Sequence, residues 1–384
     1  MKFSTKAIHI GNEPNLQEGG SGDVIVPIHL STTFARKKVS IPTAGYDYSR
    51  SRNPTRDALE KNLAALENAH YAFAFSSGLA ALTNVLLMFK PGDHIVSIDN
   101  VYGGNFRLFK QVFAQWGLEV SFVDFVTGDD IKKYIRPYTK LIFLESPTNP
   151  LMKIIDLASV ASVAKQKKIL TLVDNTFATP YWQKPLDLGT DIVLHSATKY
   201  LGGHSDVTGG CIMVNDKALA DRIGFLQNAI GAVLSPFDCY NLLKGSKTLE
   251  LRMKKHEENT LQVVEFLSKQ KKVKKIYYPG HPSHPQYKLA KKQMKGFGAV
   301  LSLELHGNRE TVRTFLESLQ LFYIAINIGE VASLIEHPAT MTHAAVPKAE
   351  REKCGLSDTL IRLSVGIEDV EDLIADLSQA LDKV

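Results

Sequence analysis

The sequence has few cysteines and no long hydrophobic run. Its three cysteines, Cys211, Cys239 and Cys354, lie far apart and form no CxxC pair. A sparse, odd set of this kind excludes a disulfide framework and a cysteine-based metal site, and it favours a reducing, cytoplasmic location. No stretch approaches about 18 consecutive apolar residues, and the first residues lack the apolar core of a signal peptide. We therefore expect no membrane span and no export signal.

An excess of charge of one sign is also missing. The chain has 45 Lys and Arg against 40 Asp and Glu, which gives a net charge of +5 over 384 residues. Its densest basic run, at 271–275, contains no aromatic residue and does not look like a nucleic-acid-binding stripe. The apolar content of 44% and the charged content of 22% are ordinary for a globular protein. The composition thus argues against nucleic acid and membrane partners.

Strand-like and helical patterns alternate through the first two thirds of the chain. Seven short apolar segments are predicted to be strands, at 71–75, 93–99, 119–124, 140–146, 169–175, 191–196 and 210–215. Helical patterns lie between most of them, for example at 56–68, 76–89, 106–116 and 157–168. Alternation of this kind predicts parallel βαβ units, and hence an α/β fold with a mostly parallel seven-stranded sheet covered on both faces.

The two ends of the chain differ from this central part. Residues 1–50 are rich in Gly, Pro and Ser and show little periodicity, so we predict an extended arm that packs on a partner. After about residue 245 come a long helix (249–270), apolar segments (298–305, 322–327 and 359–366) and a final helix (369–382), which predict a smaller α+β domain. The predicted division is an arm over 1–52, a large domain over 53–245 and a C-terminal domain over 246–384.

Polar side chains follow five of the predicted strands. They come from the segments 76–78, 100–104, 146–150, 174–176 and 196–199. Because ligands bind outside the carboxyl ends of strands in open parallel sheets, these segments are the expected site. Among them Lys199 follows Ser196 and Thr198 at the end of an apolar strand. An amine becomes a nucleophile only when neutral, so a reactive lysine with a reference pKa of ~10.4 needs burial or cationic neighbours.

Three other features of these strand ends suit a phosphorylated, cationic ring. The helix start at 76–82 offers backbone N–H groups to a phosphate. Asp174 closes an apolar strand, where an unpaired carboxylate is costly and a pyridinium N–H would hold it ionised. Tyr102, in a glycine-flanked loop, can stack on a flat ring. Together with Lys199 these are the parts of a pyridoxal phosphate site.

Each feature also has a simpler structural interpretation. Lys199 could extend into solvent from a strand end, and 76–82 could be an ordinary capped helix start. Asp174 could cap the following turn, and Tyr102 could be a half-buried loop aromatic. His281 and His284 are expected to form a surface turn rather than a metal site, and His343 is expected to be structural; no metal is predicted.

Eight motifs extend this pattern along nearly the whole chain. They are YDYSRSRNPT (46–55), SSGLAA (76–81), VYGG (101–104), ESPTNP (145–150), VDNTF (173–177), HSATKYLGGHSDVTGG (195–210), HPATMTHA (337–344) and IRLSVGIED (361–369). With these motifs the chain resembles the trans-sulfuration (Cys/Met metabolism) family of pyridoxal-phosphate-dependent enzymes. The resemblance implies an aspartate aminotransferase-like fold of type I, pyridoxal 5'-phosphate as cofactor, an amino acid as small-molecule substrate, and a homotetramer built from two active-site dimers.

The resemblance also implies roles for individual residues. Lys199 matches the Schiff-base lysine that shuttles protons, Asp174 the partner of the pyridine nitrogen, and Tyr102 the tyrosine that stacks on the ring. The positions that match phosphate-binding residues are Gly78, Leu79, Ser196 and Thr198, with Tyr48 and Arg50 reaching in from the neighbouring subunit. The positions that match substrate-binding residues are Arg362, for the α-carboxylate, together with Asn149 and Asn327.

The closest resemblance is to cystathionine γ-lyases, then to cystathionine γ-synthases. Methionine γ-lyase, cystathionine β-lyase and O-acylhomoserine sulfhydrylase are alternatives, and Gly104 argues against the first because methionine γ-lyases have Cys there. Asn327 replaces the usual Ser. Ala332 replaces the Glu that receives the distal amino group of cystathionine, and Glu330 is a candidate substitute. Outside the family, the alternatives are a Schiff-base lyase that uses no cofactor and a non-catalytic paralogue.

Overall fold

A computed structural model describes residues 1–18, 20–342, 344 and 348–384. Two sheets organise the chain, and they follow one another in sequence. The larger contains seven strands in the order β1 (Tyr71–Phe75), β7 (Gly210–Val214), β6 (Ile192–Ser196), β5 (Leu170–Asp174), β4 (Thr139–Glu145), β2 (His94–Ile98) and β3 (Glu119–Val123). The strands from β6 to β3 are parallel, and β7 runs antiparallel to both β6 and β1. The predicted mostly parallel seven-stranded sheet is therefore confirmed.

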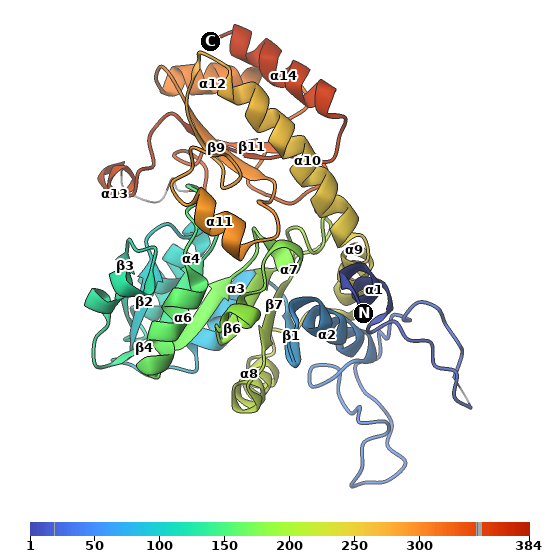
Figure 1. The fold of residues 1–384 in the computed structure, drawn as a ribbon. Coiled ribbons are helices and arrows are strands. Elements are labelled where there is room, and N and C mark those ends of the chain that lie inside the picture. The colour runs from blue at the N-terminus through green and yellow to red at the C-terminus, as the bar shows by residue number, and fades with distance from the viewer. Residues whose placement is uncertain (19, 343, 345–347) are drawn as a thin grey trace.

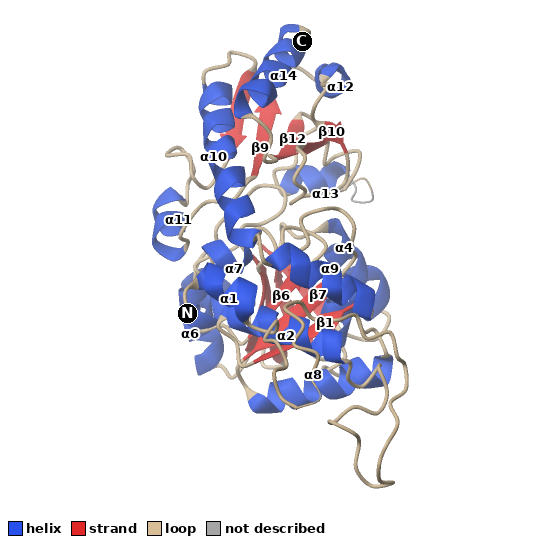
Figure 2. Cartoon of the chain, turned by 90° about the vertical axis from the view of Figure 1, so that its right-hand side faces the viewer, coloured by secondary structure: helices blue, strands red, loops and turns tan. Residues whose placement is uncertain are grey.

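Helices cover both faces of the large sheet, which explains why its strands are apolar throughout. In β7 every residue is buried, and successive side chains point to opposite faces. Ile212 packs in one core with α3 (Gly78–Leu86), α6 (Leu157–Gln166) and α8 (Lys217–Ile230). Its neighbour Met213 packs in a second core with α2 (Pro54–Glu67) and α9 (Pro236–Ser246). Figure 2 shows these helix layers on either side of the strands.

The second sheet has five strands and its own core. Their order is β10 (Tyr323–Ile324), β11 (Leu334–Glu336), β12 (Leu360–Ser364), β9 (Val300–Leu305) and β8 (Val273–Tyr277). Three helices pack on it, namely α10 (Leu249–Ser268), α12 (Arg309–Ser318) and α14 (Val370–Asp382). Figure 1 shows α10 running from the large sheet to the small one, which joins the two halves.

The remaining described elements are short. They are α1 (Phe3–His9), α4 (Gly103–Arg107) with a π-helix (Leu108–Phe113), α5 (Gly128–Ile131), α7 (Thr179–Trp182), α11 (Tyr287–Gln293), α13 (Lys348–Lys353) and 3₁₀ turns at Lys132–Tyr134 and Pro185–Leu188. None of the helices in the described part of the chain combines the length and the apolar character needed to cross a membrane.

Some sequence-based predictions were wrong in detail. The arm is not extended throughout, because residues 3–9 form α1, which packs on α2 of the same chain; residues beyond it loop away from the body (Figure 1). The helix expected at 76–89 begins at Gly78, since Ser77 caps it by accepting from Ala80 N–H at 3.0 Å. The segment 322–327 forms only a two-residue strand, and the strand β11 was missed.

Candidate active site

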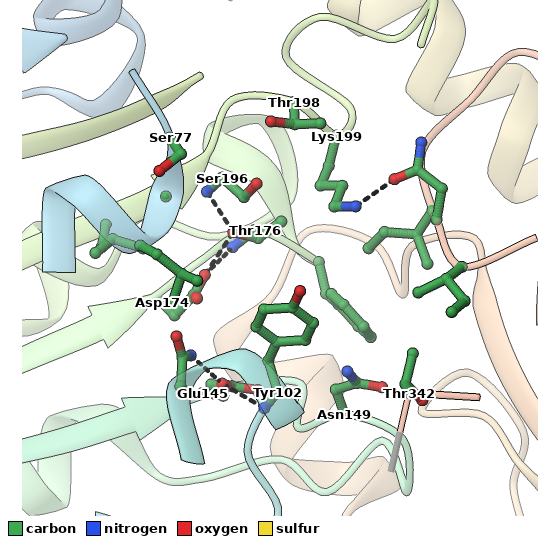
Figure 3. A pocket seen from close by; sticks show the side chains of 18 of the residues that line it. Ser77, Tyr102, Glu145, Asn149, Asp174, Thr176, Ser196, Thr198, Lys199 and Thr342 are labelled. Atoms are coloured by element: carbon green, nitrogen blue, oxygen red, sulfur yellow. Dashed lines mark hydrogen bonds between the residues drawn. The ribbon is translucent and has the colours of Figure 1, made fainter. Parts of the chain in front are cut away.

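A cavity of about 240 Å³ opens at the carboxyl edge of the large sheet. The ends of β4, β5 and β6 form one side of it, and residues 326–328 and Arg362 of the second sheet's part of the chain form the other. All three predicted catalytic residues line it, and so do seven of the other nominated positions: Gly78, Leu79, Ser196, Thr198, Arg362, Asn149 and Asn327. Strands distant in sequence thus bring these residues together, as Figure 3 shows.

The start of α3 forms one end of the cavity, where the sequence predicts a phosphate site. The hydroxyl of Ser77 accepts a hydrogen bond from the Ala80 N–H. The N–H groups of Gly78 and Leu79, in the same first turn, have no partner inside the helix and can face an anion. Ser196 lies directly opposite, since a β-carbon on Gly78 would come within 3.2 Å of its Cα. A glycine is therefore needed for the helix start to approach β6 so closely.

Asp174 lies at the far end of the cavity, held by its neighbours. Its Oδ1 accepts hydrogen bonds from the Thr176 backbone N–H, at 3.1 Å, and from the Thr176 hydroxyl. Burial raises the pKa of Asp174, whereas the bonds from Thr176 and the charge of His195 lower it. A cationic ring nitrogen would meet a carboxylate here. Thr176, which the sequence analysis placed in the expected site without a role of its own, also accepts from the Ser196 N–H at 2.8 Å and so joins β6 to the acid.

Tyr102 lies between these groups with its ring in the cavity (Figure 3). It precedes α4, and its backbone N–H donates to Glu145 Oε1 at 2.9 Å. A β-carbon at Gly104 would lie 2.3 Å from the Tyr102 ring, so this ring position requires glycine there. The ring is 40% exposed, which leaves a face available for stacking.

Lys199 points into the cavity rather than into solvent. Its amine donates to Asn327 Oδ1 (Figure 3), and Asn327 in turn donates to Ser205 at 3.2 Å. Burial, followed by the positive charge of Arg362, lowers the pKa of Lys199 to about 8. The structure therefore provides the two conditions that a nucleophilic lysine requires, desolvation and a cationic neighbour.

Arg362 is buried and fixed by a carboxylate that sequence reasoning missed. Its Nη1 lies 2.9 Å from Glu336 Oε1 and donates to Asn149 Oδ1 at 2.8 Å, while Nη2 donates to the Asn327 carbonyl at 3.2 Å. Arg362 and Glu336 face each other across β12 and β11. The sequence gave no signal for Glu336, because β11, which Glu336 ends, was not predicted.

Several other nominated residues lie elsewhere. Tyr48 and Arg50 do not line the cavity of their own chain; Arg50 donates to the Asn228 carbonyl at 2.5 Å. Glu330 does not line it either, and its Oε1 accepts from Val331 N–H at 3.1 Å. His284 is buried, not part of a surface turn. His343 lies outside the described residues, and the residues that are described contain no cluster of metal ligands.

The residues present fit pyridoxal phosphate. A helix start with free N–H groups faces two hydroxyls, a tyrosine ring lies centrally, and a buried acid and an amine of lowered pKa lie at the remaining sides. On an α/β fold of this type, such a site defines a pyridoxal-phosphate-dependent enzyme.

The comparisons identify the family. A sequence profile of the Cys/Met metabolism PLP-dependent enzymes matches residues 4–382, so the chain belongs to that family. It is 51% identical to a cystathionine γ-lyase of Dictyostelium discoideum (100% of this chain, 98% of the relative) and 50% identical to a cystathionine β-lyase of Coxiella burnetii (99% and 97%). It also resembles the crystal structure of cystathionine γ-lyase from Lactobacillus plantarum complexed with L-serine, with a TM-score of 0.96 and 46% identity over 100% of this chain and 99% of that one.

Three predictions are thereby confirmed. The chain is an enzyme of the carbon–sulfur lyase class in cysteine and methionine metabolism, its cofactor is pyridoxal 5'-phosphate, and its fold is type I of the enzymes that use this cofactor. Relatives of nearly equal similarity carry the names γ-lyase and β-lyase, so family membership alone does not decide the bond that is cleaved.

Proposed function

We propose that this enzyme cleaves cystathionine at Cγ and releases cysteine, 2-oxobutanoate and ammonia, as a cystathionine γ-lyase does. The observation that carries the proposal is one cavity lined by the amine of Lys199, the carboxyl of Asp174 and the buried guanidinium of Arg362. These are the groups needed to remove a proton from Cα of an α-amino acid.

The chain's own residues would divide the work as follows. Pyridoxal phosphate, when bound, supplies an aldehyde for the substrate amine and a ring that accepts electrons from Cα. Asp174 holds the ring nitrogen, and Tyr102 covers one face of the ring. Arg362 binds the α-carboxylate with its planar fork and so orients Cα toward Lys199. With a pKa of about 8, a useful fraction of Lys199 is neutral at physiological pH and can take the Cα proton.

A second proton, removed from Cβ, then allows the Cγ–sulfur bond to break. The sulfur leaves as cysteine after gaining a proton, and water completes the conversion of the remaining four carbons to 2-oxobutanoate and ammonia. Lys199 would remove the two protons in turn, giving up the first to the bound cofactor before it takes the second, because the guanidinium of Arg362, which also lines the cavity, stays charged.

Cystathionine γ-synthase, which joins an O-acylhomoserine to cysteine, is the second candidate. The acids that line the cavity, among the described residues, are Glu145 and Asp174, both at strand ends in the large sheet. Ala332 offers no carboxylate, and Glu330 bonds to its own backbone instead. A single chain therefore supplies no evident partner for the distal ammonium, which cystathionine would bring to a γ-lyase and cysteine to a γ-synthase, so this feature does not separate the two reactions.

A product assay separates the possibilities. Holoenzyme given cystathionine should form 2-oxobutanoate and cysteine in equal amounts, and Lys199→Ala should form neither. Pyruvate and homocysteine as the main products would replace the proposal by β-lyase activity. Turnover only with O-succinyl- or O-acetylhomoserine plus cysteine would identify a synthase, and no turnover of any of these substrates would favour a non-catalytic paralogue.

We also propose a cytoplasmic homotetramer of two active-site dimers. The supporting observation is that Tyr48 and Arg50 do not line the cavity of their own chain and belong to the segment between α1 and α2, which projects from the body (Figure 1). The guanidinium of Arg56 holds this region by donating to the carbonyls of Ser49 and Arg50 at 2.8 and 3.0 Å. The division into an arm (1–52), a large domain (53–245) and a C-terminal domain (246–384) belongs to the same proposal.

A further inference from the structure

A second carboxylate, Glu145, lies beside Asp174 in the cavity. Glu145 is the last residue of β4 and Asp174 the last residue of β5, and the two are direct partners in the parallel pairing. Both line the cavity, and Glu145 is only 5% exposed. Two carboxyl groups placed side by side at the wall of a cavity, Glu145 buried and Asp174 partly buried, repel each other when both are ionised.

The contacts of Glu145 give it a structural task as well. Its Oε1 accepts from the backbone N–H of Tyr102 at 2.9 Å and from the side-chain amide of Asn105 at 2.8 Å, as the dashed lines in Figure 3 show. Asn105 also interacts with Asp174. Glu145 therefore connects the loop that carries the stacking tyrosine to the acid at the end of the ring site.

We propose that Glu145 is a positioning residue that works as a neutral carboxylic acid. One of its oxygens fixes Tyr102 and Asn105, and the negative charge of the Glu145–Asp174 pair is on Asp174. This rests on the proposed role of Asp174 as partner of the cofactor's ring nitrogen. A cationic ring nitrogen beside Asp174 stabilises the charge there and not on Glu145, so the two acids are kept in different protonation states.

The surroundings of Glu145 agree with this assignment. Burial, and then the charge of Asp174, raise the pKa of Glu145 to about 8, against the lowering effect of its bonds from Tyr102 and Asn105. The titratable groups on the elements around it are Asp174 on β5, Tyr102 before α4, and, following β2, Asp99, which is 3.2 Å from the amine of Lys153. Lys199 and Arg362 line the cavity but do not pair with Glu145.

The test is infrared spectroscopy of the holoenzyme at neutral pH. The difference spectrum of wild type minus Glu145→Gln should contain the carbonyl stretch of a protonated carboxylic acid, and that of wild type minus Glu304→Gln should not. Glu60, whose pKa burial raises to about 7, contributes to every spectrum and cancels in the differences. Glu304 is a suitable control because it is a buried glutamate that pairs with Lys274 at 3.0 Å. In the wild-type apoprotein the band should disappear as the pH is raised through about 8, and Asp174→Asn should move that midpoint to lower pH because the repelling charge is gone.

Cofactor affinity supplies a second readout. Glu145→Gln, which keeps an acceptor oxygen and carries no charge, should bind pyridoxal phosphate within about threefold of wild type. Glu145→Leu should lose on the order of tenfold, because the N–H of Tyr102 and the amide of Asn105 are left unpaired. A loss in Glu145→Gln as large as that in Asp174→Asn, or the absence of an acid band from the wild-type minus Glu145→Gln difference spectrum, would overturn the proposal. Neither measurement uses a substrate, so an error in the proposed reaction would not affect them.

Discussion

Replacing Lys199 by methionine tests whether the cavity lowers the pKa of this amine by disfavouring its charged form. Burial and the charge of Arg362 lower the pKa of Lys199 from 10.5 to about 8. At about 1.36 kcal/mol per pKa unit, the cavity disfavours the charged amine by about 3 kcal/mol. We therefore expect the apoprotein with Lys199→Met to be more stable than the wild-type apoprotein by up to about 3 kcal/mol at pH 7.

The pH dependence of this difference follows from the two pKa values. Between pH 8 and 10.5 the unfolded chain keeps the Lys199 proton and the folded chain does not, so wild-type stability rises with pH in this window. The variant lacks that rise. The stability gap should therefore be largest below pH 8 and should close above pH 10.5.

Urea unfolding of the two apoproteins, followed by circular dichroism across this pH range, measures the gap. Lys90→Met is the matched control, because Lys90 is exposed and its replacement should change stability by no more than about 0.5 kcal/mol. A Lys199→Met apoprotein that is less stable than wild type at pH 7, or a gap that does not change with pH, would refute the reasoning.

Three further predictions concern charged groups. Glu336→Gln removes one partner of the buried pair with Arg362 and should lower the free energy of unfolding by about 3 kcal/mol. The control, Glu317→Gln in an exposed pair with Arg313, should lower it by no more than about 1 kcal/mol. Equal losses for the two variants in urea titrations would contradict the buried pairing. Arg50→Ala should weaken pyridoxal phosphate binding on the order of tenfold or more, because a hydrogen bond from a charged group contributes ~1.5–3 kcal/mol, and an unchanged Kd would remove Arg50 from the shared site. Arg362→Lys keeps the charge but loses the planar fork, so steady-state kinetics should show KM for cystathionine raised about tenfold with a smaller change in kcat; an unaltered kcat/KM would exclude Arg362 from carboxylate binding.

The large sheet could be predicted because its strands are buried on both faces and are therefore apolar without interruption. The helix α10 could be predicted equally well from the sequence, since its amphipathic pattern persists over 20 residues. The short elements were not. The helix α1 has seven residues and buries only Ala7, and β10 has two residues, both exposed. Elements of that size are stabilised by tertiary contacts that leave little periodic signal in the sequence.

The site was predictable where a polar residue ends an apolar strand. That signal found Asp174 and, just beyond a strand end, Lys199, and applied with equal rigour it would also have drawn attention to Glu145. It could not find Glu336, because β11, which Glu336 ends, was not predicted. What the sequence did not provide is which strand ends are neighbours. β4 and β5 are consecutive in the chain and adjacent in the sheet, but the register that sets Glu145 opposite Asp174 became visible only in the structure.

The most direct test of the account is chemical trapping of the cofactor on the protein. The holoenzyme is reduced with borohydride, digested, and its peptides are mapped by mass spectrometry. We predict one modified peptide, carrying the mass of reduced pyridoxal phosphate on Lys199, and none in Lys199→Ala. The same mass on a different lysine, or no modified peptide from protein saturated with the cofactor, would contradict the assignment of Lys199 on which the whole account depends.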